Sequence, residues 1–542
     1  MALRTGLQVD ESRMAFLIET IAGSGLPKFH SDVFYLIGTP VGYLFAPLAW
    51  IFDGSTFITA IRMGHVVLAT IGIYFVWRFV LELTGNTAAA VAVTIAATLD
   101  PLGIYWGTVA QPYSMLSLAT LLVVYSAWRA MSEPDSQVLR RIDLSNPLVW
   151  LVIWLAIGSF THYAIWLVIP GVIVASYLRW GKVLLRAAHP MRVALELSII
   201  FPILVWMFGS WIGPGSGSSF NPGPPEFNQI WNNAMRLWQV DVNLGLWRSL
   251  YYGSTFSQFV PFLILLATGM IVGWYFLKER LATSEEASDP IPTFGIVLVL
   301  ASYWGPLLII ANGSLSVLLI GVLPFGYMVI GLALLKMVPV WDIRLDRRRI
   351  RMAPPVIAAG LLLLPVVFYL IQGTRWQIDF RSGDPDYYEA SSYIETVLQP
   401  DQLLLTPFPA IAWMEMGDVG RSRIVPLAGP KDGTRLASET RNLSSSRAPD
   451  YYVDYWTGKP AIGTTAQLCQ FLLYVVPAPL ILMDVDRLAS DSSFRGDFAT
   501  VINQGTLIIS EGENGLQLRT PLTLDQWSIR AQELCGIAPA PA

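Results

Sequence analysis

Long hydrophobic runs with few charges dominate the first two thirds of the chain. Most are about 18 to 25 residues long, the length of a helix that crosses a hydrocarbon core about 30 Å thick. The pattern predicts an α-helical polytopic membrane domain with about ten spans. The runs cover residues 57–81, 87–104, 113–131, 147–161, 163–178, 193–213, 258–277, 293–311, 315–336 and 354–372.

The segment 33–52 is also long and uncharged, but Pro40 and Pro47 would interrupt a helix there. Short cytoplasmic loops carry an excess of Lys and Arg. With ten spans the basic loops fall on one side, so we expect residues 33–52 to lie on the membrane surface and both termini to be external. An eleventh span is the alternative. The basic loops hold Arg140, Arg141, Arg179, Lys182, Arg186, Arg192, Lys278, Arg280, Arg344, Arg347, Arg348, Arg349 and Arg351.

From about residue 374 the hydrophobic runs shorten and polar residues become frequent. Strand-like runs at 403–405, 480–483 and 507–509 alternate with helix-like stretches at 387–398, 465–473 and 524–534, which indicates a soluble α/β domain. The chain therefore divides into a membrane domain, 1–373, with an external loop at 1–56, and an extracytoplasmic domain, 374–542. The second domain has 20 acidic and 13 basic side chains, which argues against nucleic acid as a partner.

Composition agrees with a membrane protein. The chain is 54% hydrophobic and only 14% charged, against about 25% charged in soluble domains. Its two cysteines, Cys469 and Cys535, both lie in the C-terminal domain. An extracytoplasmic compartment would permit a disulfide between them, but sequence spacing alone leaves two unpaired thiols equally open.

Residues 10–26 predict a short amphipathic helix at the membrane surface. Met14, Leu17, Ile18 and Ile21 recur at helical spacing, and Gly23 and Gly25 mark the end. Read from composition alone, Asp10 and Glu11 cap this helix and complement its dipole.

Several other polar residues have structural explanations. His65 lies about one turn from Arg62 on the first long span, where packing or snorkelling explains it better than catalysis. Asp100 precedes Pro101 and reads as a helix-end residue. Gln111 and Tyr113 suit either an aromatic belt or a substrate site.

Three short motifs change the interpretation of the first helix: Asp10-Glu11-Ser12-Arg13, Ala110-Gln111-Pro112-Tyr113 and Gly158-Ser159-Phe160-Thr161-His162-Tyr163. With Arg62 near the outer end of the first long span, their order resembles the C-type glycosyltransferases. The nearest in pattern are the protein O-mannosyltransferases and the lipid A aminoarabinose transferases. The resemblance covers residues 9–372 in layout.

The resemblance implies inverting transfer of a sugar from a polyprenyl-phosphate donor in the cell membrane to an acceptor at its outer face. Asp10 corresponds to the general base, which takes the acceptor's proton, and Glu11 would orient the acceptor or Asp10. Arg13 and His162 are candidate ligands of the donor phosphate. Arg62, Gln111 and Tyr113 are candidate substrate-binding residues. The scheme needs no cofactor, although paired carboxylates could hold a divalent metal.

The chain also departs from the family pattern. Relatives often have a basic residue or a His-Pro-Pro motif where this chain has Gly38-Thr39-Pro40, and they often have Arg where it has Gln111. Relatives carry a span before the Asp-Glu loop, so either the true start lies upstream or the protein dispenses with that span. A non-catalytic membrane protein with this fold is therefore the main alternative. A lipid or sugar transporter is less favoured, because the ionisable residues lie near the ends of the spans.

Overall fold

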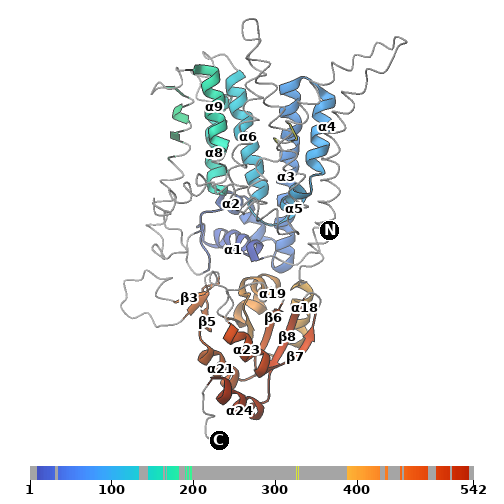
Figure 1. Cartoon of the computed structure of the whole chain (residues 1–542), viewed down its shortest axis with the longest axis vertical. Coiled ribbons are helices and arrows are strands. Elements are labelled where there is room, and N and C mark those ends of the chain that lie inside the picture. The colour runs from blue at the N-terminus through green and yellow to red at the C-terminus, as the bar shows by residue number, and fades with distance from the viewer. Residues whose placement is uncertain are drawn as a thin grey trace, which may run out of the picture. The chain divides into compact units, whose positions relative to one another are not determined.

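The computed structural model groups the chain into two compact units. One contains the described residues up to Gly64 together with those from Tyr387 onward, and the other contains those from His65 to Met328. Figure 1 labels their elements. The structure describes residues 9–30, 35–132, 144–162, 165, 168–181, 189–190, 192–194, 196–197, 200, 325, 327–328, 387–427, 434–436, 452–454, 457–485, 496–512 and 515–535.

Two described helices are long and apolar enough to cross a membrane, α3 (Gly54–Thr84) and α6 (Tyr113–Ser132). The 31 residues of α3 correspond to about 46 Å of helix, more than the hydrocarbon core requires. α8 (Pro147–Thr161) is shorter and packs against α6, and α9 (Ile169–Trp180) follows it. The long helices predicted at 57–81, 113–131 and 147–161 are therefore confirmed as helices.

Hydropathy predicted a single helix at 87–104, but the structure has two helices there. α4 (Thr87–Thr98) ends before Asp100, which caps α5 (Pro101–Thr108) by accepting a hydrogen bond from the Gly103 amide at 2.5 Å. Pro101 cannot donate a backbone hydrogen bond, so a new helix starts there at little cost. The expected role of Asp100 at a helix end is confirmed. The described part of the span predicted at 163–178 contains most of α9.

Other sequence predictions lie outside the described residues. These are the spans at 258–277, 293–311 and 354–372, most of those at 193–213 and 315–336, and the basic loops around residues 140, 186, 280 and 348. The span count and the domain boundary at 373 remain predictions.

The first unit begins with α1 (Val9–Ser24), which confirms the helix predicted at 10–26. Gly25 follows at a φ of 73°, and its amide donates to the carbonyl of Ile21. A left-handed glycine of this kind is a common helix terminator. Two short helices follow, α2 (Thr39–Phe45) and η1 (Ala46–Trp50). Neither has the length of a span, so the described part of 33–52 is not one crossing helix; its place on the membrane surface stays a prediction.

The C-terminal part of the first unit is an α/β layer around a five-stranded sheet of order β2-β1-β6-β8-β7. β1 pairs in parallel with β2 and β6, whereas β8 pairs antiparallel with β6 and β7. A second antiparallel sheet has the order β3-β4-β5. The strands are β1 (Leu404–Thr406), β2 (Ile424–Pro426), β3 (Thr434–Leu436), β4 (Tyr452–Asp454), β5 (Pro460–Ala461), β6 (Leu480–Asp484), β7 (Thr506–Glu511) and β8 (Leu516–Pro521).

Every residue of the central strand β6 is buried, as expected for its apolar run Leu480 to Met483. The last residue, Asp484, is also buried, and its Oδ2 accepts a hydrogen bond from the Tyr387 hydroxyl at 2.6 Å. The helices are α18 (Tyr387–Val397), α19 (Pro409–Arg423), α21 (Thr465–Tyr474), α23 (Gly496–Gly505) and α24 (Leu524–Cys535). A capping box of Thr464 and Gln467 starts α21. The predicted alternation of strands and helices is confirmed, and the α/β layer with it.

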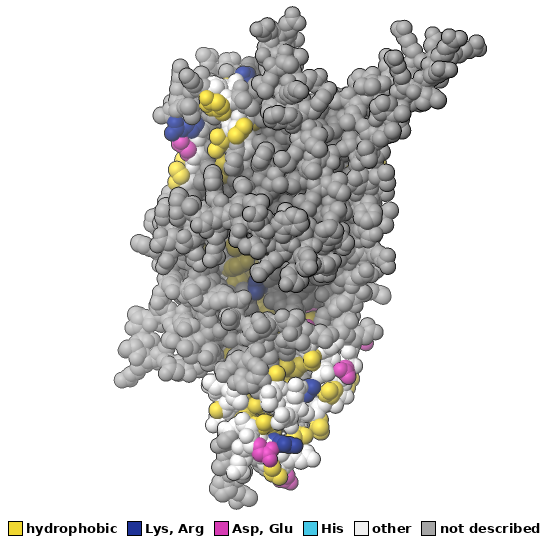
Figure 2. Space-filling view, viewed as in Figure 1, with side chains coloured by type: hydrophobic (Ala, Val, Ile, Leu, Met, Phe, Trp, Pro, Cys, Tyr) yellow, Lys and Arg dark blue, Asp and Glu magenta, His cyan; other side chains and the backbone are white. Residues whose placement is uncertain are grey.

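Cys469 on α21 and Cys535 at the end of α24 form a disulfide, with their Cα atoms 6.5 Å apart. The structure thus favours the bonded alternative over two free thiols. Figure 2 shows charged side chains of both signs scattered among hydrophobic ones on the C-terminal domain, as on a water-facing surface.

Candidate functional site

The first unit places Glu11 of α1 against Arg62 of α3. The Arg62 Nε donates to Glu11 Oε1 at 2.9 Å, and Nη2 donates to Oε2 at 2.7 Å. Both residues are buried, at 1% and 5% exposure. A two-point contact between planar groups fixes direction as well as distance. The pair therefore sets the rotation of α1 about its axis.

Asp10 directly precedes Glu11 in α1, but its side chain lies outside the described part of the structure. Arg13 is partly buried and lies three residues after Asp10, so the two positions share a helix face. The structure thus brings Glu11 and Arg62 into contact and places Arg13 on the helix that carries Asp10.

The predicted apolar stripe of α1 is buried, since Met14, Leu17, Ile18 and Ile21 are all at most 4% exposed. The helix is buried on other faces too, and Ser12 is at 0%. Gly42 of α2 packs closely on this stripe, since a Cβ added there would lie 2.6 Å from the Ile21 Cδ1 and would push that side chain aside. An amphipathic helix resting on a membrane surface is therefore an incomplete description, because protein covers most of α1.

In the second unit, Tyr113 and His162 are neighbours, with ring centroids 5.9 Å apart. His162 follows the last residue of α8, and its backbone amide donates to the carbonyl of Gly158 at 2.8 Å. Gln111 is buried at 3% exposure just before α6. Residues from two separate sequence motifs thus meet where α6 begins and α8 ends.

His65 is fully buried on α3, and its Nδ1 lies 2.6 Å from Ser114 Oγ. This hydrogen bond joins α3 to the start of α6. It agrees with the packing role expected for His65. Ser114 was not singled out from the sequence, although it stands next to Tyr113.

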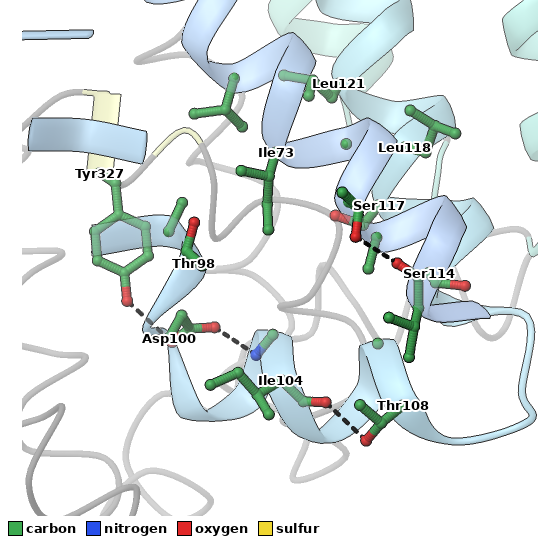
Figure 3. Close-up of a pocket in the computed structure, with 18 residues that line it drawn as sticks. Ile73, Thr98, Asp100, Ile104, Thr108, Ser114, Ser117, Leu118, Leu121 and Tyr327 are labelled. Atoms are coloured by element: carbon green, nitrogen blue, oxygen red, sulfur yellow. Dashed lines mark hydrogen bonds between the residues drawn. The ribbon is translucent and has the colours of Figure 1, made fainter. Parts of the chain in front are cut away.

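A cavity of about 190 Å³ is lined by α3, α4, α5 and α6 in this unit. Its walls are mostly aliphatic, and Asp100, Ser114 and Tyr327 contribute polar groups (Figure 3). The Tyr327 hydroxyl donates to Asp100 Oδ1 at 2.9 Å. Sequence reasoning gave no hint of this bond, because the two residues are 227 positions apart.

Within the described part of the chain, no group of three or more His, Cys, Asp or Glu side chains is arranged to hold a metal ion. Because the Asp10 side chain is not among those described, metal dependence stays untested.

The profile of the dolichyl-phosphate-mannose-protein mannosyltransferase family matches residues 39–206. Among solved structures, the chain is similar to ArnT from Cupriavidus metallidurans bound to undecaprenyl phosphate, with a TM-score of 0.54 and 12% identity over 96% of this chain and 95% of that one. The apo form of that protein gives a TM-score of 0.52 and 11% identity over 97% and 95%. No curated protein sequence matches significantly.

The apo oligosaccharyltransferase from Archaeoglobus fulgidus gives a TM-score of 0.50 and 12% identity over 98% of this chain and 74% of that one. The chain therefore has the membrane fold of the C-type glycosyltransferases. The predicted resemblance is confirmed by this fold and by the family profile over residues 39–206.

Proposed function

We propose that the protein is a membrane glycosyltransferase that moves a sugar from a polyprenyl-phosphate donor to an acceptor at the outer membrane face. The observation that carries the proposal is the buried Glu11–Arg62 pair. It orients the helix that holds Asp10 in a chain with the C-type fold and the family profile match. A buried ion pair that fixes direction suits a site that must hold a base in place.

In the proposed reaction, Asp10 takes the proton of the acceptor hydroxyl while the acceptor oxygen attacks the anomeric carbon of the sugar. The bond from that carbon to the phosphate oxygen breaks, and polyprenyl phosphate leaves with the electron pair. Attack opposite the leaving group inverts the anomeric centre. No covalent intermediate, cofactor or metal is needed.

Arg13 would stabilise charge on the departing phosphate, since a guanidinium offers parallel donors to two phosphate oxygens. From the sequence, His162 stays a second candidate ligand of the phosphate, and Gln111 and Tyr113 stay candidates for substrate contact. Arg62 stays a candidate substrate-binding residue, and its two hydrogen bonds to Glu11 also make it a positioning residue for α1.

The test is transfer of label, in vesicles that contain the protein, from polyprenyl-phosphate-linked mannose or aminoarabinose to an acceptor that can be separated from the donor lipid. Asp10→Asn removes the base but keeps the shape, so transfer should fall by about 10²- to 10⁴-fold. Asp525→Asn makes the same change in the first turn of α24 and should leave transfer unchanged. Near-normal transfer by Asp10→Asn would return Asp10 to a structural role, and an inactive wild type would favour the non-catalytic alternative.

A further inference from the structure

The helix that carries Asp10 also contacts the C-terminal domain, through aromatic rings. Phe16 of α1 meets the ring of Trp413 on α19 edge-on at 5.7 Å between centroids. His30, in the segment after α1, lies 5.3 Å from Phe16 and 5.0 Å from Trp413. Trp413 is buried at 8% exposure. Figure 1 shows α1 and α19, which belong to the same compact unit and pack together.

Charge pairing reinforces the same contact. Glu19, two turns after Glu11 on α1, accepts from Arg421 Nη2 at 2.6 Å and lies 3.2 Å from His30 Nε2. The Arg421 guanidinium is also 5.9 Å from the centre of the Trp413 ring, within cation–π range. We call Phe16, Glu19, His30, Trp413 and Arg421 the α1–α19 clamp.

The backbone of α19 explains how Trp413 and Arg421 reach the same partner. Gly417 interrupts the helix with a φ of 56° and a ψ of −139°, so the two halves of α19 point in different directions. A side chain at this position would be strained. The turn lets residues on either side of Gly417 face α1.

A lysine next to the smaller sheet also contacts α19. Lys459, just before β5, donates to the carbonyls of Arg421 and Ile424, and its ammonium lies 5.2 Å from the Trp413 ring centre. Burial lowers the pKa of Lys459 from its ordinary value. The carbonyls and the ring compensate for the lost water. The clamp is thus anchored in the body of the C-terminal domain.

We propose that Arg421 and Trp413 are positioning residues through which the C-terminal domain holds α1, and with it Asp10, in the geometry for transfer. This rests on the proposed function. Asp10 lies nine residues before Glu19 on one helix, about 13 Å away. A helix transmits a tilt along its length, and a displacement of about 1 Å at reacting groups can cost about 10²-fold in rate. The soluble domain therefore takes part in catalysis without touching the substrates.

The kinetic test compares Arg421→Met, Arg421→Lys, Glu19→Gln and the Glu19→Gln, Arg421→Met double variant in the transfer assay. Arg421→Met should lower kcat about 10- to 100-fold with KM for the donor nearly unchanged, since positioning acts on the reacting step. Arg421→Lys should restore part of the rate because it keeps the charge. The double variant should be no slower than the slower single variant, since both remove one contact.

Arg530→Gln is the matched control, because it removes an arginine from an exposed ion pair with Glu533 on α24. Its kcat should equal that of the wild type. If Arg421→Met lowered only the amount of folded protein, with normal kcat per folded molecule, the role would be structural and the proposal wrong.

Hydrogen exchange of the α1 amides separates this proposal from the proposed function. Exchange should quicken across Ala15–Ile21 in Arg421→Met and stay unchanged in Arg530→Gln. If the wild type transfers no sugar, the proposed function fails while exchange still decides whether α19 holds α1. Either unchanged exchange of the α1 amides or an unchanged kcat in Arg421→Met would overturn the proposal that the clamp positions Asp10.

Discussion

At the scale of single residues, the Glu11–Arg62 pair combines deep burial with opposite charge, so each partner compensates for the desolvation of the other. Removing one partner leaves an uncompensated buried charge, which costs about 3 to 5 kcal/mol, whereas exposed pairs are worth about 0 to 1 kcal/mol. Arg62 and Glu11 are at most 5% exposed. By contrast, the side chains of the Arg192–Glu196 pair are 41% and 49% exposed.

We therefore expect Arg62→Met to lower the free energy of unfolding by several kcal/mol, and Arg192→Met to change it by less than about 1 kcal/mol. Adding Glu11→Gln to Arg62→Met should recover part of the loss, because the orphaned carboxylate becomes neutral. Thermal unfolding in detergent measures all three. Equal, small losses for both arginines would show that the buried pair is not a determinant of stability.

The proposed donor site depends most on Arg13, because a phosphate bound at interface depth would need a cation beside it. Arg13→Ala should reduce turnover strongly, and Arg13→Lys should restore only part because an ammonium lacks the planar fork. His162→Ala should have a smaller effect. The measurements are transfer rates and binding of polyprenyl phosphate. Full activity in an Arg13→Ala, His162→Ala double variant would remove the assignment of the phosphate site.

At the scale of elements, the C-terminal domain depends on a close contact between the end of α23 and α24. Trp527 is fully buried, and a Cβ at Gly505 would collide with its ring. Gly505→Ala should therefore destabilise the protein by about 1 to 3 kcal/mol, the usual cost of overpacking. Gly512→Ala is the control, since its Cβ would lie an ordinary 3.7 Å from Leu516. Thermal unfolding compares them, and equal melting temperatures would mean that the Trp527 ring moves aside freely.

Elements dictated by their own sequence were predictable, and those decided by distant partners were not. The apolar length of α3 and α6 is local information, as is the apolar run of β6. Hydropathy did not reveal the break at Asp100, because a single capping residue hardly changes the average over a span. The strands β1 and β2 are only three residues each, and β2 had no recognisable pattern.

The candidate site divides in the same way. Glu11 and Arg62 were both named from the sequence, but their contact spans 51 positions and only the fold brings them together. Tyr113 and His162 were likewise named separately and lie side by side. Trp413 and Arg421 were missed, because no local sequence pattern indicates that these two residues contact α1. The individual candidate residues could thus be predicted from the sequence, whereas the contacts between them could not.

At the scale of the whole molecule, the disulfide bears on the compartment of the C-terminal domain, because such bonds persist in oxidising surroundings. Cys469 and Cys535 are 66 residues apart, so their bond should contribute about 2 to 5 kcal/mol to stability. In intact cells neither cysteine should react with a maleimide until a reductant is added, and Cys469→Ser should lower the melting temperature. Ready labelling without reductant would show free thiols in place of the disulfide.

The bonded cysteines leave a chain without reactive thiols, in which single introduced cysteines can map its orientation. The basic loops predict that positions 280 and 348 face the cytoplasm, whereas positions 10 and 450 face outward. In intact cells an impermeant maleimide should label Asp10→Cys and Asp450→Cys directly. Arg280→Cys and Arg348→Cys should react only after the membrane is permeabilised. Because the proposed donor reaches the site from the outer leaflet, Asp10 and the C-terminal domain must share that side. Labelling of positions 10 and 348 from the same side would overturn both the topology and the external site.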